Sequence, residues 1–484
     1  MDRKIVAYKM YINGKWVEAE DHHTFEAVNP GNWEVIGTIP QGTRQDVREA
    51  VKAARNAWES YRWTSVWERS ALLKRIAKSI EAHREELAHT LSLEQGKPYA
   101  TEALAEIAAV VTGFINAAEQ IKWLESPVIP VEDKKKRVFS ILQPKGVYAV
   151  ISPWNFPCNI PCEYITAALA TGNAVVWNPA STTSICAVKL TECFQEAGVP
   201  EGLVNMVTGK GSIVGDELVI SNGVNGIGFT GSTEVGKIIA ARGAGKPMIM
   251  ELGGNGPSVI LKDADLDMAV PRVAAGCFFN AGQVCGATAR ILVESEIYDE
   301  VAERMVAQAN AVRLGDPLDP QTTMGPMNNK DVFEKNIEHA KDALEKGAEI
   351  LIGGGPAKQF ERGFFFEPTV AVNVPLDSLY NMEETFGPVA PLIRFDSHEQ
   401  ALEIANMDAW GLVKSVFTRD MKYAMYFAER LKSGIVNVND NNCYWELHLP
   451  FGGASGKQSG IGRVGGKQAM LSMCDIKTIT LDIG

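Results

Sequence analysis

The chain has 484 residues, which at roughly 100–200 residues per domain suggests two to four domains. Its 47 Lys and Arg against 59 Asp and Glu give a net charge of −12, which argues against a nucleic-acid binder because such proteins usually carry a basic stripe. Apolar residues make up 46% and charged residues 22%, which excludes disordered and fibrous proteins and leaves ample chain for a large core.

No leader, membrane span or metal site is expected. The apolar stretch at residues 5–8 is too short for a signal peptide. No run approaches the roughly 18 apolar residues of a membrane helix. The eight cysteines form no paired framework, and the nearest pair, Cys158 and Cys162, lacks the second pair of ligands that a zinc site needs. We therefore expect reduced thiols in a cytoplasmic protein.

The first 120 residues predict a short strand region followed by helices. Asn13-Gly14 separates two short runs as in a β-hairpin turn. Thr43 and Asp46 resemble a capping box at the start of a helix. A longer helix is expected from about residue 66 to 93, ended by Gly96.

Beyond residue 146, short apolar runs alternate with helical segments. The first of these runs does not alternate in polarity, as expected for a buried parallel strand. Strands are expected at residues 147–152, 174–177, 204–207 and 226–229. This repeated β-α order predicts a doubly wound parallel sheet, which binds ligands beyond the C-terminal ends of its strands. A second α/β region is expected at residues 255–445, and residues 476–483 alternate like an exposed or swapped strand.

A glycine turn follows the last of those strands. Gly231 permits a tight turn where the strand gives way to a helix, and Ser232 begins that helix. The backbone N–H groups of a helix N-terminus can hold a phosphate. The next glycine, Gly236, is five residues on, so the pattern is not Gly-x-Gly-x-x-Gly, and a turn without a ligand explains it equally well.

Three polar residues are candidates for chemistry. Glu251 ends an apolar run beside two glycines, and among apolar neighbours it would have the raised pKa of a general base; a solvated Glu is the alternative. Cys285 lies among small residues near an expected helix or loop start, where helix N–H groups can stabilise a nucleophilic thiolate; a buried inert thiol is the alternative. Asn155 lies between two prolines that hold its amide as an oxyanion donor requires; a turn Asn is the alternative.

Together these motifs resemble the NAD(P)-dependent aldehyde dehydrogenase superfamily, in its non-acylating form, over nearly the whole chain. The 34-residue step from Glu251 to Cys285 is similar to that of the family. Further matching segments are residues 93–98, 153–157, 229–236, 251–254, 282–285, 384–388 and 450–453.

The resemblance implies an aldehyde-dehydrogenase-like α/β fold. A Rossmann-like cofactor domain would comprise residues 1–121 and 145–253, and an α/β catalytic domain residues 254–450. A β oligomerisation arm would comprise residues 122–144 and 468–484. The arm would complete the sheet of a neighbouring copy, which gives a homodimer or homotetramer.

The resemblance also implies the reaction. Cys285 would attack an aldehyde, and the Asn155 amide with the Cys285 backbone N–H would stabilise the oxyanion. Hydride transfer to the nicotinamide would then leave a thioester on Cys285. Glu251 would activate the water that hydrolyses it, which favours release of a carboxylic acid over transfer to coenzyme A.

The implied cofactor is NAD, with NADP left open. The family's ribose motif is usually Lys-Pro-x-Glu, whereas this chain has Asn178 and Ser181 at its ends. Losing the Glu removes the carboxylate that repels a 2′-phosphate, and losing the Lys removes a cation that attracts it; no adjacent cation replaces it, which favours NAD. Tyr164 stands where the family commonly has a Lys. The implied cofactor residues are Trp154, Asn178, Ser181, Gly231, Ser232, Leu252, Gly253, Glu384 and Phe386.

The implied substrate pocket has no Arg, which weakens the case for a strongly anionic substrate. Its expected lining is Phe156, Glu163, Val284, Tyr444, Trp445 and His448, with Cys162 and Gly286 beside them. Aromatic residues with Glu163 suit a neutral, aromatic or cationic aldehyde, unless Glu163 points to solvent.

Two other classes stay open. A Cys-dependent esterase or thioesterase would use Cys285 and Glu251 without redox chemistry, but it would not need the Gly231 turn or the Glu384 motif. A catalytically silent structural homologue would explain the altered cofactor motifs.

Overall fold

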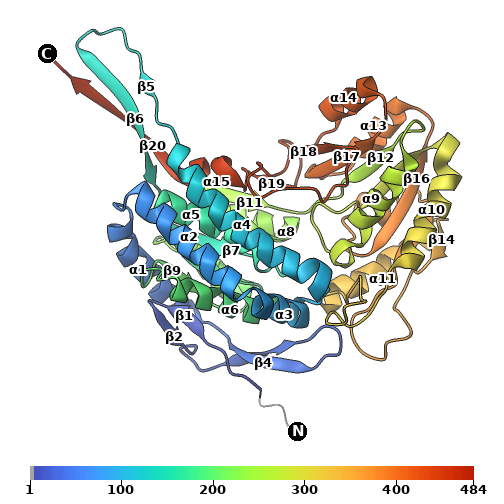
Figure 1. Ribbon diagram of the computed structural model, residues 1–484, viewed down its shortest axis with the longest axis horizontal. Helices are drawn as coiled ribbons and strands as arrows, with labels where there is room; N and C mark the ends of the chain where they lie inside the picture. Colours follow the sequence, from blue (N-terminus) through green and yellow to red (C-terminus); the bar gives the residue numbers. More distant parts are fainter. Residues whose placement is uncertain (1–4) are drawn as a thin grey trace.

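The structure, a computed structural model, describes residues 5–484, so the first four residues of the expected segment 1–121 lie outside the described residues. Two large sheets lie side by side, each flanked by helices, and a narrow sheet projects from one of them (Figure 1). The predicted α/β class is confirmed.

The first large sheet has the strand order β19-β11-β10-β7-β8-β9-β1-β2. The five strands from β11 to β9 are parallel, β19 and β1 pair antiparallel with β11 and β9, and the edge strand β2 pairs antiparallel with β1. The predicted doubly wound sheet and its four strands are therefore confirmed. The strands are β1 (Met10–Ile12), β2 (Lys15–Val17), β7 (Val147–Ile151), β8 (Ala174–Asn178), β9 (Val204–Met206), β10 (Gly226–Thr230), β11 (Met248–Glu251) and β19 (Gly460–Ile461).

Helices cover this sheet, with α1 and α5 packed directly on its strands and α2 and α4 packed on α5 (Figure 1). The helices around this sheet are α1 (Arg44–Tyr61), α2 (Val66–Ala82), α3 (Arg84–Gln95), α4 (Leu104–Gln120), α5 (Asn159–Thr171), α6 (Ser184–Glu196), α7 (Asp216–Ile220), α8 (Thr233–Arg242) and α15 (Gly466–Ser472).

The hairpin turn and the helix cap predicted near the N-terminus are both present. Asn13 and Gly14 both take positive φ angles, 52° and 78°, in the turn between β1 and β2. Thr43 and Asp46 form the capping box of α1, each side chain bonding the other residue's backbone N–H.

The single helix expected from about residue 66 to 93 is instead two helices. His83 interrupts it with φ −104° and ψ 14°, ending α2 and beginning α3. Ile80 and Leu87 on either side of the break are both buried. The apolar spacing therefore continues across the break and conceals it.

One helical segment, Tyr99–Trp123, is long and apolar enough to cross a membrane by length and composition, contrary to the expectation that no run approaches this. Within it, Ile107, Val110 and Phe114 are fully buried, and α4 packs against α2 and α5. One apolar face of the segment therefore packs into the core.

The second large sheet has the order β14-β15-β16-β13-β12-β17-β18, parallel except for β14. It confirms the second α/β region expected at residues 255–445. Its strands are β12 (Pro257–Ile260), β13 (Arg290–Glu294), β14 (Glu349–Ile352), β15 (Thr369–Val372), β16 (Val389–Phe395), β17 (Val413–Phe417) and β18 (Ile435–Val438). Its helices are α9 (Leu266–Phe278), α10 (Tyr298–Ala311), α11 (Lys330–Glu345), α12 (Leu379–Met382), α13 (His398–Asn406) and α14 (Met421–Arg430).

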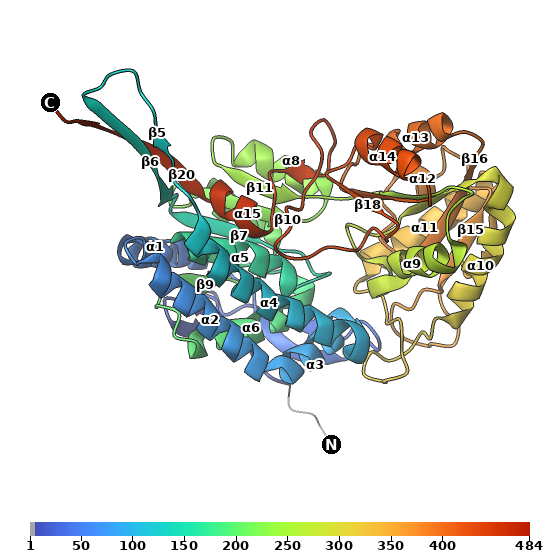
Figure 2. The same cartoon turned by 45° about the horizontal axis from the view of Figure 1, so that its top comes forward.

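The projecting sheet consists of β5 (Val128–Ile129), β6 (Lys136–Pro144) and β20 (Cys474–Asp482). β20 pairs antiparallel with β6 along its whole length, and the C-terminus lies near the tip (Figure 2). The exposed strand predicted near the C-terminus is therefore confirmed. A separate two-stranded sheet joins β3 (Thr24–Val28) and β4 (Val35–Pro40).

Candidate active site

Two cavities meet at Cys285, which lines both. The larger, of about 500 Å³, lies beyond the C-terminal ends of β7, β8, β10 and β11, where a doubly wound sheet binds its ligands. The smaller, of about 250 Å³, extends from Cys285 between α4, α5 and the segment 442–451. Thr230 at the end of β10 also lines both cavities.

Cys285 lies in the loop between α9 and β13, and three consecutive left-handed residues precede it closely. Asn280, Ala281 and Gly282 have φ angles of 51°, 52° and 70°. A Cβ on Gly282 would lie 1.9 Å from the carbonyl oxygen of Gly387, so only glycine fits there. Of the helix or loop start expected at Cys285, the structure has the loop, because Cys285 follows α9 and a short 3₁₀ turn.

The surroundings of Cys285 favour the neutral thiol. Burial, with the carboxyl groups of Glu384, Glu251 and Glu163 nearby, raises the pKa of the thiol. The thiol is therefore protonated at neutral pH, and nucleophilic attack requires a base to take its proton.

Asn155 follows β7, and both ends of the residue are held by hydrogen bonds. Its Nδ2 donates to the carbonyl oxygen of Gln283 at 3.0 Å, two residues before Cys285. Its own carbonyl oxygen accepts from Lys97 Nζ and Asn280 Nδ2, each at 3.0 Å. An amide nitrogen has two hydrogens, so one N–H of Asn155 is left for a ligand in the larger cavity.

A buried ion pair lies beneath Asn155. Lys97 Nζ lies 2.6 Å from Glu106 Oε2, and both side chains are almost fully buried. Glu106 Oε1 also accepts from the backbone N–H groups of Cys158 and Asn159 at 3.0 Å, where α5 begins. The pair therefore fixes the segment that carries Asn155. Sequence analysis did not single out either residue, although Lys97 falls within the matching segment 93–98.

Glu251 lies at the end of β11, where Gly460 of β19 pairs with it. Both carboxylate oxygens are buried without a hydrogen-bond partner among residues 5–484. Burial and the nearby Glu163 raise the pKa of Glu251, and Arg463 opposes this effect. Glu251 and Cys285 line the same smaller cavity, so a water held there would meet a strongly basic carboxylate.

The N-terminus of α8 opens into the larger cavity. Ser232 caps this helix, its Oγ accepting from Val235 N at 3.3 Å, and Gly231 lies beside it in the wall. The first backbone N–H groups of a helix have no intrahelical partner and attract anions. These residues fit the pyrophosphate of a dinucleotide.

Glu384 and Phe386 form the opposite wall. Glu384 Oε1 accepts from Gly254 N at 2.8 Å, and a Cβ on Gly253 would lie 2.7 Å from the other oxygen. Burial raises the pKa of Glu384 to about 7. Phe386 has a φ of 58° and packs edge-on against Trp154, with ring centroids 5.5 Å apart. A strained aromatic residue at a cavity wall is a typical feature of a ligand site.

Eight of the nine residues expected at the cofactor line this cavity, and Asn178 does not. The eight are Trp154, Ser181, Gly231, Ser232, Leu252, Gly253, Glu384 and Phe386. The Asn178 amide instead donates to the carbonyl oxygens of Val207 at 3.0 Å and Gly209 at 3.3 Å. It therefore braces the loop after β9.

Tyr164 is fully buried beneath β10. Its hydroxyl lies 3.0 Å from the Phe229 carbonyl oxygen and 2.8 Å from Thr230 Oγ1, and a Cβ on Gly228 would meet its ring. Tyr164 is absent from the walls of both cavities. Within residues 5–484, no group of three or more His, Cys, Asp or Glu side chains is arranged to hold a metal ion.

Four of the six residues expected at the substrate line the smaller cavity, and Gly286 lines it as well. These four are Phe156, Glu163, Val284 and Trp445. Tyr444 and His448 do not line it, because both side chains turn outward to Glu446, the Tyr444 hydroxyl at 3.0 Å and His448 Nδ1 at 3.4 Å. Lining residues that sequence analysis missed are Glu102, Glu106, Phe279, Asn442, Cys443 and Phe451.

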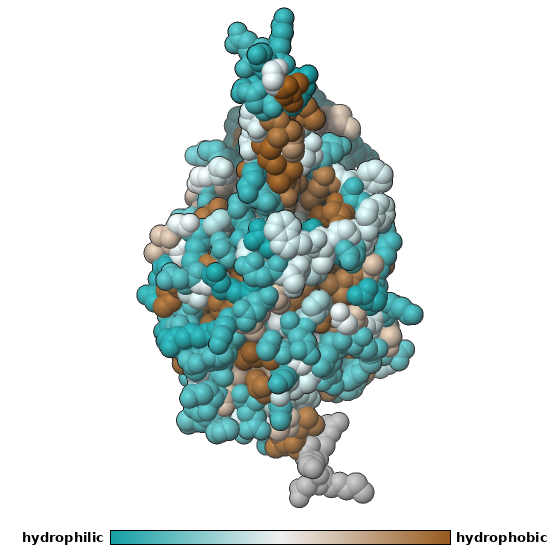
Figure 3. Space-filling view, turned by 90° about the vertical axis from the view of Figure 1, so that its left-hand side faces the viewer, coloured by the Kyte–Doolittle hydropathy of each residue, from teal (hydrophilic) through white to brown (hydrophobic). Residues whose placement is uncertain are grey.

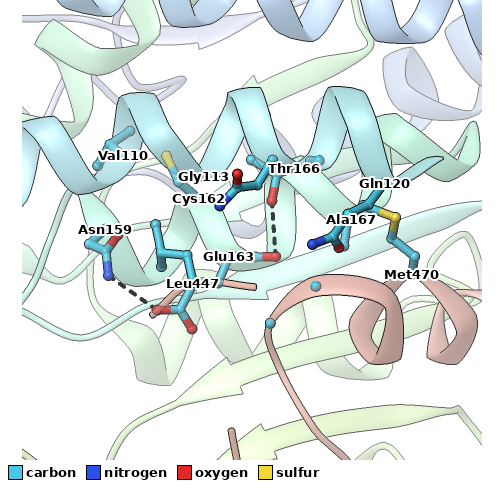
Figure 4. Close-up of a pocket in the computed structure, with 14 residues that line it drawn as sticks. Val110, Gly113, Gln120, Asn159, Cys162, Glu163, Thr166, Ala167, Leu447 and Met470 are labelled. Atoms are coloured by element: carbon cyan, nitrogen blue, oxygen red, sulfur yellow. Dashed lines mark hydrogen bonds between the residues drawn. The ribbon is translucent and has the colours of Figure 1, made fainter. Parts of the chain in front are cut away.

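A small side pocket adjoins this cavity where Asn159, Glu163 and Leu447 line both (Figure 4). Cys162 lies in the side pocket, not in the cavity itself. Glu163 accepts a hydrogen bond from Asn159 Nδ2 at 3.2 Å. Its side chain therefore lines the cavity wall and is part-buried.

Comparisons with known proteins agree with this arrangement. Residues 16–479 match the model of the Aldehyde dehydrogenase family. The chain is 37% identical to lactaldehyde dehydrogenase of Methanocaldococcus jannaschii, over 98% of this chain and 100% of that one. It is also 37% identical to succinate-semialdehyde dehydrogenase [NADP(+)] of Escherichia coli, over 100% and 99%. The structure of an aldehyde dehydrogenase from Bacillus cereus in complex with NAD+ superposes with a TM-score of 0.96 at 37% identity, over 99% and 97%. The chain therefore belongs to the aldehyde dehydrogenase family and is an NAD(P)-dependent enzyme that oxidises aldehydes.

Proposed function

We propose that this enzyme releases a free carboxylic acid, with Cys285 as the nucleophile, Asn155 as the oxyanion donor and Glu251 as the base. The observation that carries the proposal is the buried, unpartnered carboxylate of Glu251 in the cavity that Cys285 also lines. An enzyme that passed its acyl group to another thiol would not need a base at that place.

In the first half-reaction, the Cys285 sulfur bonds to the aldehyde carbon as the thiol proton passes to Glu251. The negative charge that develops on the carbonyl oxygen is stabilised by the free N–H of Asn155 and the Cys285 backbone N–H. NAD or NADP supplies the hydride acceptor in this family. Loss of hydride from the former aldehyde carbon leaves a thioester on Cys285.

Before the second half-reaction, Glu251 releases the thiol proton to solvent. Water then attacks the thioester carbon while the Glu251 carboxylate takes a proton from it. The carbon–sulfur bond breaks, the carboxylic acid leaves, and the proton on Glu251 passes to the Cys285 sulfur, which regenerates the thiol. The cofactor would be held by Ser232 and the N-terminus of α8 at its pyrophosphate, by Glu384 at a ribose, and by Trp154 and Phe386 near the nicotinamide.

NAD is the preferred cofactor in this proposal. Among the residues of the described chain that line the larger cavity, Lys335 is the one basic side chain. Its Nζ is bound to the carbonyl oxygen of Glu384. The larger cavity of the described chain therefore has no unengaged cation for a 2′-phosphate, although Lys330 lines an adjoining cavity that Ser181 also lines.

The test is the formation of reduced cofactor by the pure protein over a panel of aldehydes, with NAD and NADP compared side by side and Cys285→Ala as control. We expect the unaltered protein to form reduced cofactor and the Cys285→Ala variant to form none. Hydrolysis of 4-nitrophenyl acetate by Cys285 without dehydrogenase turnover would instead support the esterase alternative. Failure to bind either cofactor, with an unreactive Cys285, would support the silent homologue.

We also propose that the sheet of β5, β6 and β20 joins copies of this chain into a homodimer or homotetramer, and that residues 122–144 and 468–484 form this arm. An apolar stripe runs along the projecting sheet (Figure 3), in which Val128 is 77% and Ile476 73% exposed. Such a patch marks an interaction surface. A cytoplasmic location is proposed because all eight cysteines are free thiols.

A further inference from the structure

We infer that the smaller cavity selects aldehydes that carry a protonated amine at the end away from the carbonyl. This inference rests on the proposed function, because it takes Cys285 as the point where the carbonyl binds. It names a substrate class for the same site, the cationic amino-aldehydes.

The charges that line the cavity are all of one sign. Four carboxylic side chains line it, Glu102, Glu106, Glu163 and Glu251, and its lining residues in the described chain include no Lys, Arg or His. Glu106 is neutralised by Lys97, and Glu251 is the proposed base. Glu102 and Glu163 have neither assignment.

Glu102 and Glu163 lack the partners that buried carboxyl groups normally have. Glu102 Oε1 accepts from Asn280 N at 3.1 Å, but its Oε2 is buried with no partner in the described chain. Glu163 accepts from Asn159, and neither glutamate forms an ion pair in the described part of the chain. Burial raises the pKa of Glu102 to about 7, although the nearby Lys97 opposes this, and burial raises the pKa of Glu163 well above its usual value. Such groups are costly to bury unless a cation joins them.

Further acceptor atoms lie around Glu163. Asn159 Oδ1 and Gln120 Oε1 are buried without partners in the described residues, and both side chains line the side pocket with Glu163 (Figure 4). An ammonium group brings three N–H donors and no acceptor. It would bind Glu163 and Asn159, which line both the cavity and the side pocket, whereas a carboxylate on the substrate would add a further acceptor and a repelling charge.

The remaining walls are aromatic. Phe156 and Phe279 have ring centroids 6.0 Å apart, and Trp445 and Phe451 5.1 Å apart. All four rings line the cavity. Lys97 Nζ already occupies one face of Phe156, 3.9 Å from its ring centroid. Aromatic faces attract cations and accept apolar methylene chains, but they offer an anion no compensation. Aromatic and acidic walls together therefore favour a short alkyl chain that ends in a cation.

The decisive comparison uses three aldehydes of similar size: 3-aminopropanal, butanal and succinic semialdehyde. Butanal replaces the ammonium group of 3-aminopropanal with a methyl group of similar size. We expect kcat/KM for 3-aminopropanal to exceed that for butanal by about 10- to 100-fold, the range that one charge-assisted hydrogen bond supplies, and succinic semialdehyde to be the poorest substrate. Turnover of butanal or succinic semialdehyde without this preference would overturn the inference and leave the proposed function standing. Turnover of none of the three would count against both.

Two variants locate the selectivity. Glu163→Gln and Glu102→Gln keep side-chain size but remove the charge, so we expect each to lower the ratio of kcat/KM for 3-aminopropanal to that for butanal by about tenfold. Glu446→Gln is the matched control, because Glu446 lies on the neighbouring segment outside the cavity wall. An unchanged ratio in both cavity variants would refute the assignment.

A second readout does not depend on turnover. Binding of 3-aminopropan-1-ol, which has the ammonium group but no aldehyde, is expected to slow alkylation of Cys285 by iodoacetamide more than 1-butanol at equal concentration. The protection should weaken in Glu163→Gln. Equal protection by the two alcohols would show that the cavity does not recognise the cation.

Discussion

The proposed role of Glu251 as the base depends on the absence of a hydrogen-bond partner for its carboxylate in the described chain. Neither carboxylate oxygen has a partner in the described chain, and burial raises its pKa. Because only the ionised form can take a proton from water, we expect the rate of thioester hydrolysis to rise with pH, about tenfold per unit below the pKa of Glu251. The measurement is kcat as a function of pH at saturating aldehyde and cofactor. A flat profile would show that another step limits the rate or that another group is the base.

The variant Glu251→Gln tests the base of both half-reactions. Gln has nearly the same size but cannot take a proton, so we expect a fall in steady-state turnover of about 10²- to 10⁴-fold. Because Glu251 is the proposed base of both steps, we expect no burst of reduced cofactor in stopped-flow absorbance; a burst of one reduced cofactor per active site would show that another base serves the first step. Steady-state turnover equal to that of the unaltered enzyme would contradict the assignment.

Asn155 acts through a side-chain amide, whereas its contacts to Lys97 and Asn280 use the backbone carbonyl. Asn155→Ala therefore keeps those two contacts and removes the oxyanion donor. We expect kcat to fall by about 10²- to 10³-fold with little change in cofactor affinity. Steady-state kinetics measures the first quantity and fluorescence titration with NAD the second.

At the scale of single elements, the Lys97–Glu106 pair joins α4 to the segment that carries Asn155. Lys97→Met leaves Glu106 charged and buried, so we expect a loss of about 3–5 kcal/mol in the free energy of unfolding. The double variant Lys97→Met/Glu106→Gln should recover part of this loss, because Gln still accepts from the backbone of α5. Urea denaturation of the three proteins checks both expectations, and equal midpoints for the single and double variants would contradict them.

The elements that periodicity and turn chemistry define were predictable from the sequence. The Asn13-Gly14 hairpin, the capping box at Thr43 and the parallel strands β7 to β10 depend on local signals. The break at His83 was not predictable, since apolar spacing continues across it.

The candidate site, too, was predictable from the sequence only in part. Cys285, Glu251 and Asn155 each give a modest local signal, and they were predicted together because their order and spacing resemble those of the aldehyde dehydrogenase superfamily. Glu102 and Glu106 did not, although two carboxylates four residues apart beside an apolar helix are a usable signal. The direction of a side chain in an irregular segment depends on tertiary contacts, which explains why Tyr444 and His448 were misplaced.

At the scale of the whole molecule, the arm presents apolar side chains that no other part of the described chain covers. Ile476→Lys places a charge on this surface, so we expect the assembly to dissociate toward monomers in light scattering coupled to size-exclusion chromatography. Ile337→Lys on α11 is the matched control, since Ile337 is also exposed but lies far from the arm in the fold. Equal masses for both variants would show that the arm does not hold copies together.

The left-handed segment before Cys285 has a consequence for how the enzyme becomes active during folding. Asn280 is held by Gln95, Glu102 and Asn155, which lie 185, 178 and 125 residues away along the chain. Contacts between such distant residues close large loops and form after local ones. In refolding from urea, helical circular dichroism should therefore return before enzymatic activity does. Cys285 is positioned only when both large sheets have formed and docked. A partly folded molecule is therefore inactive, and the return of activity measures completion of folding.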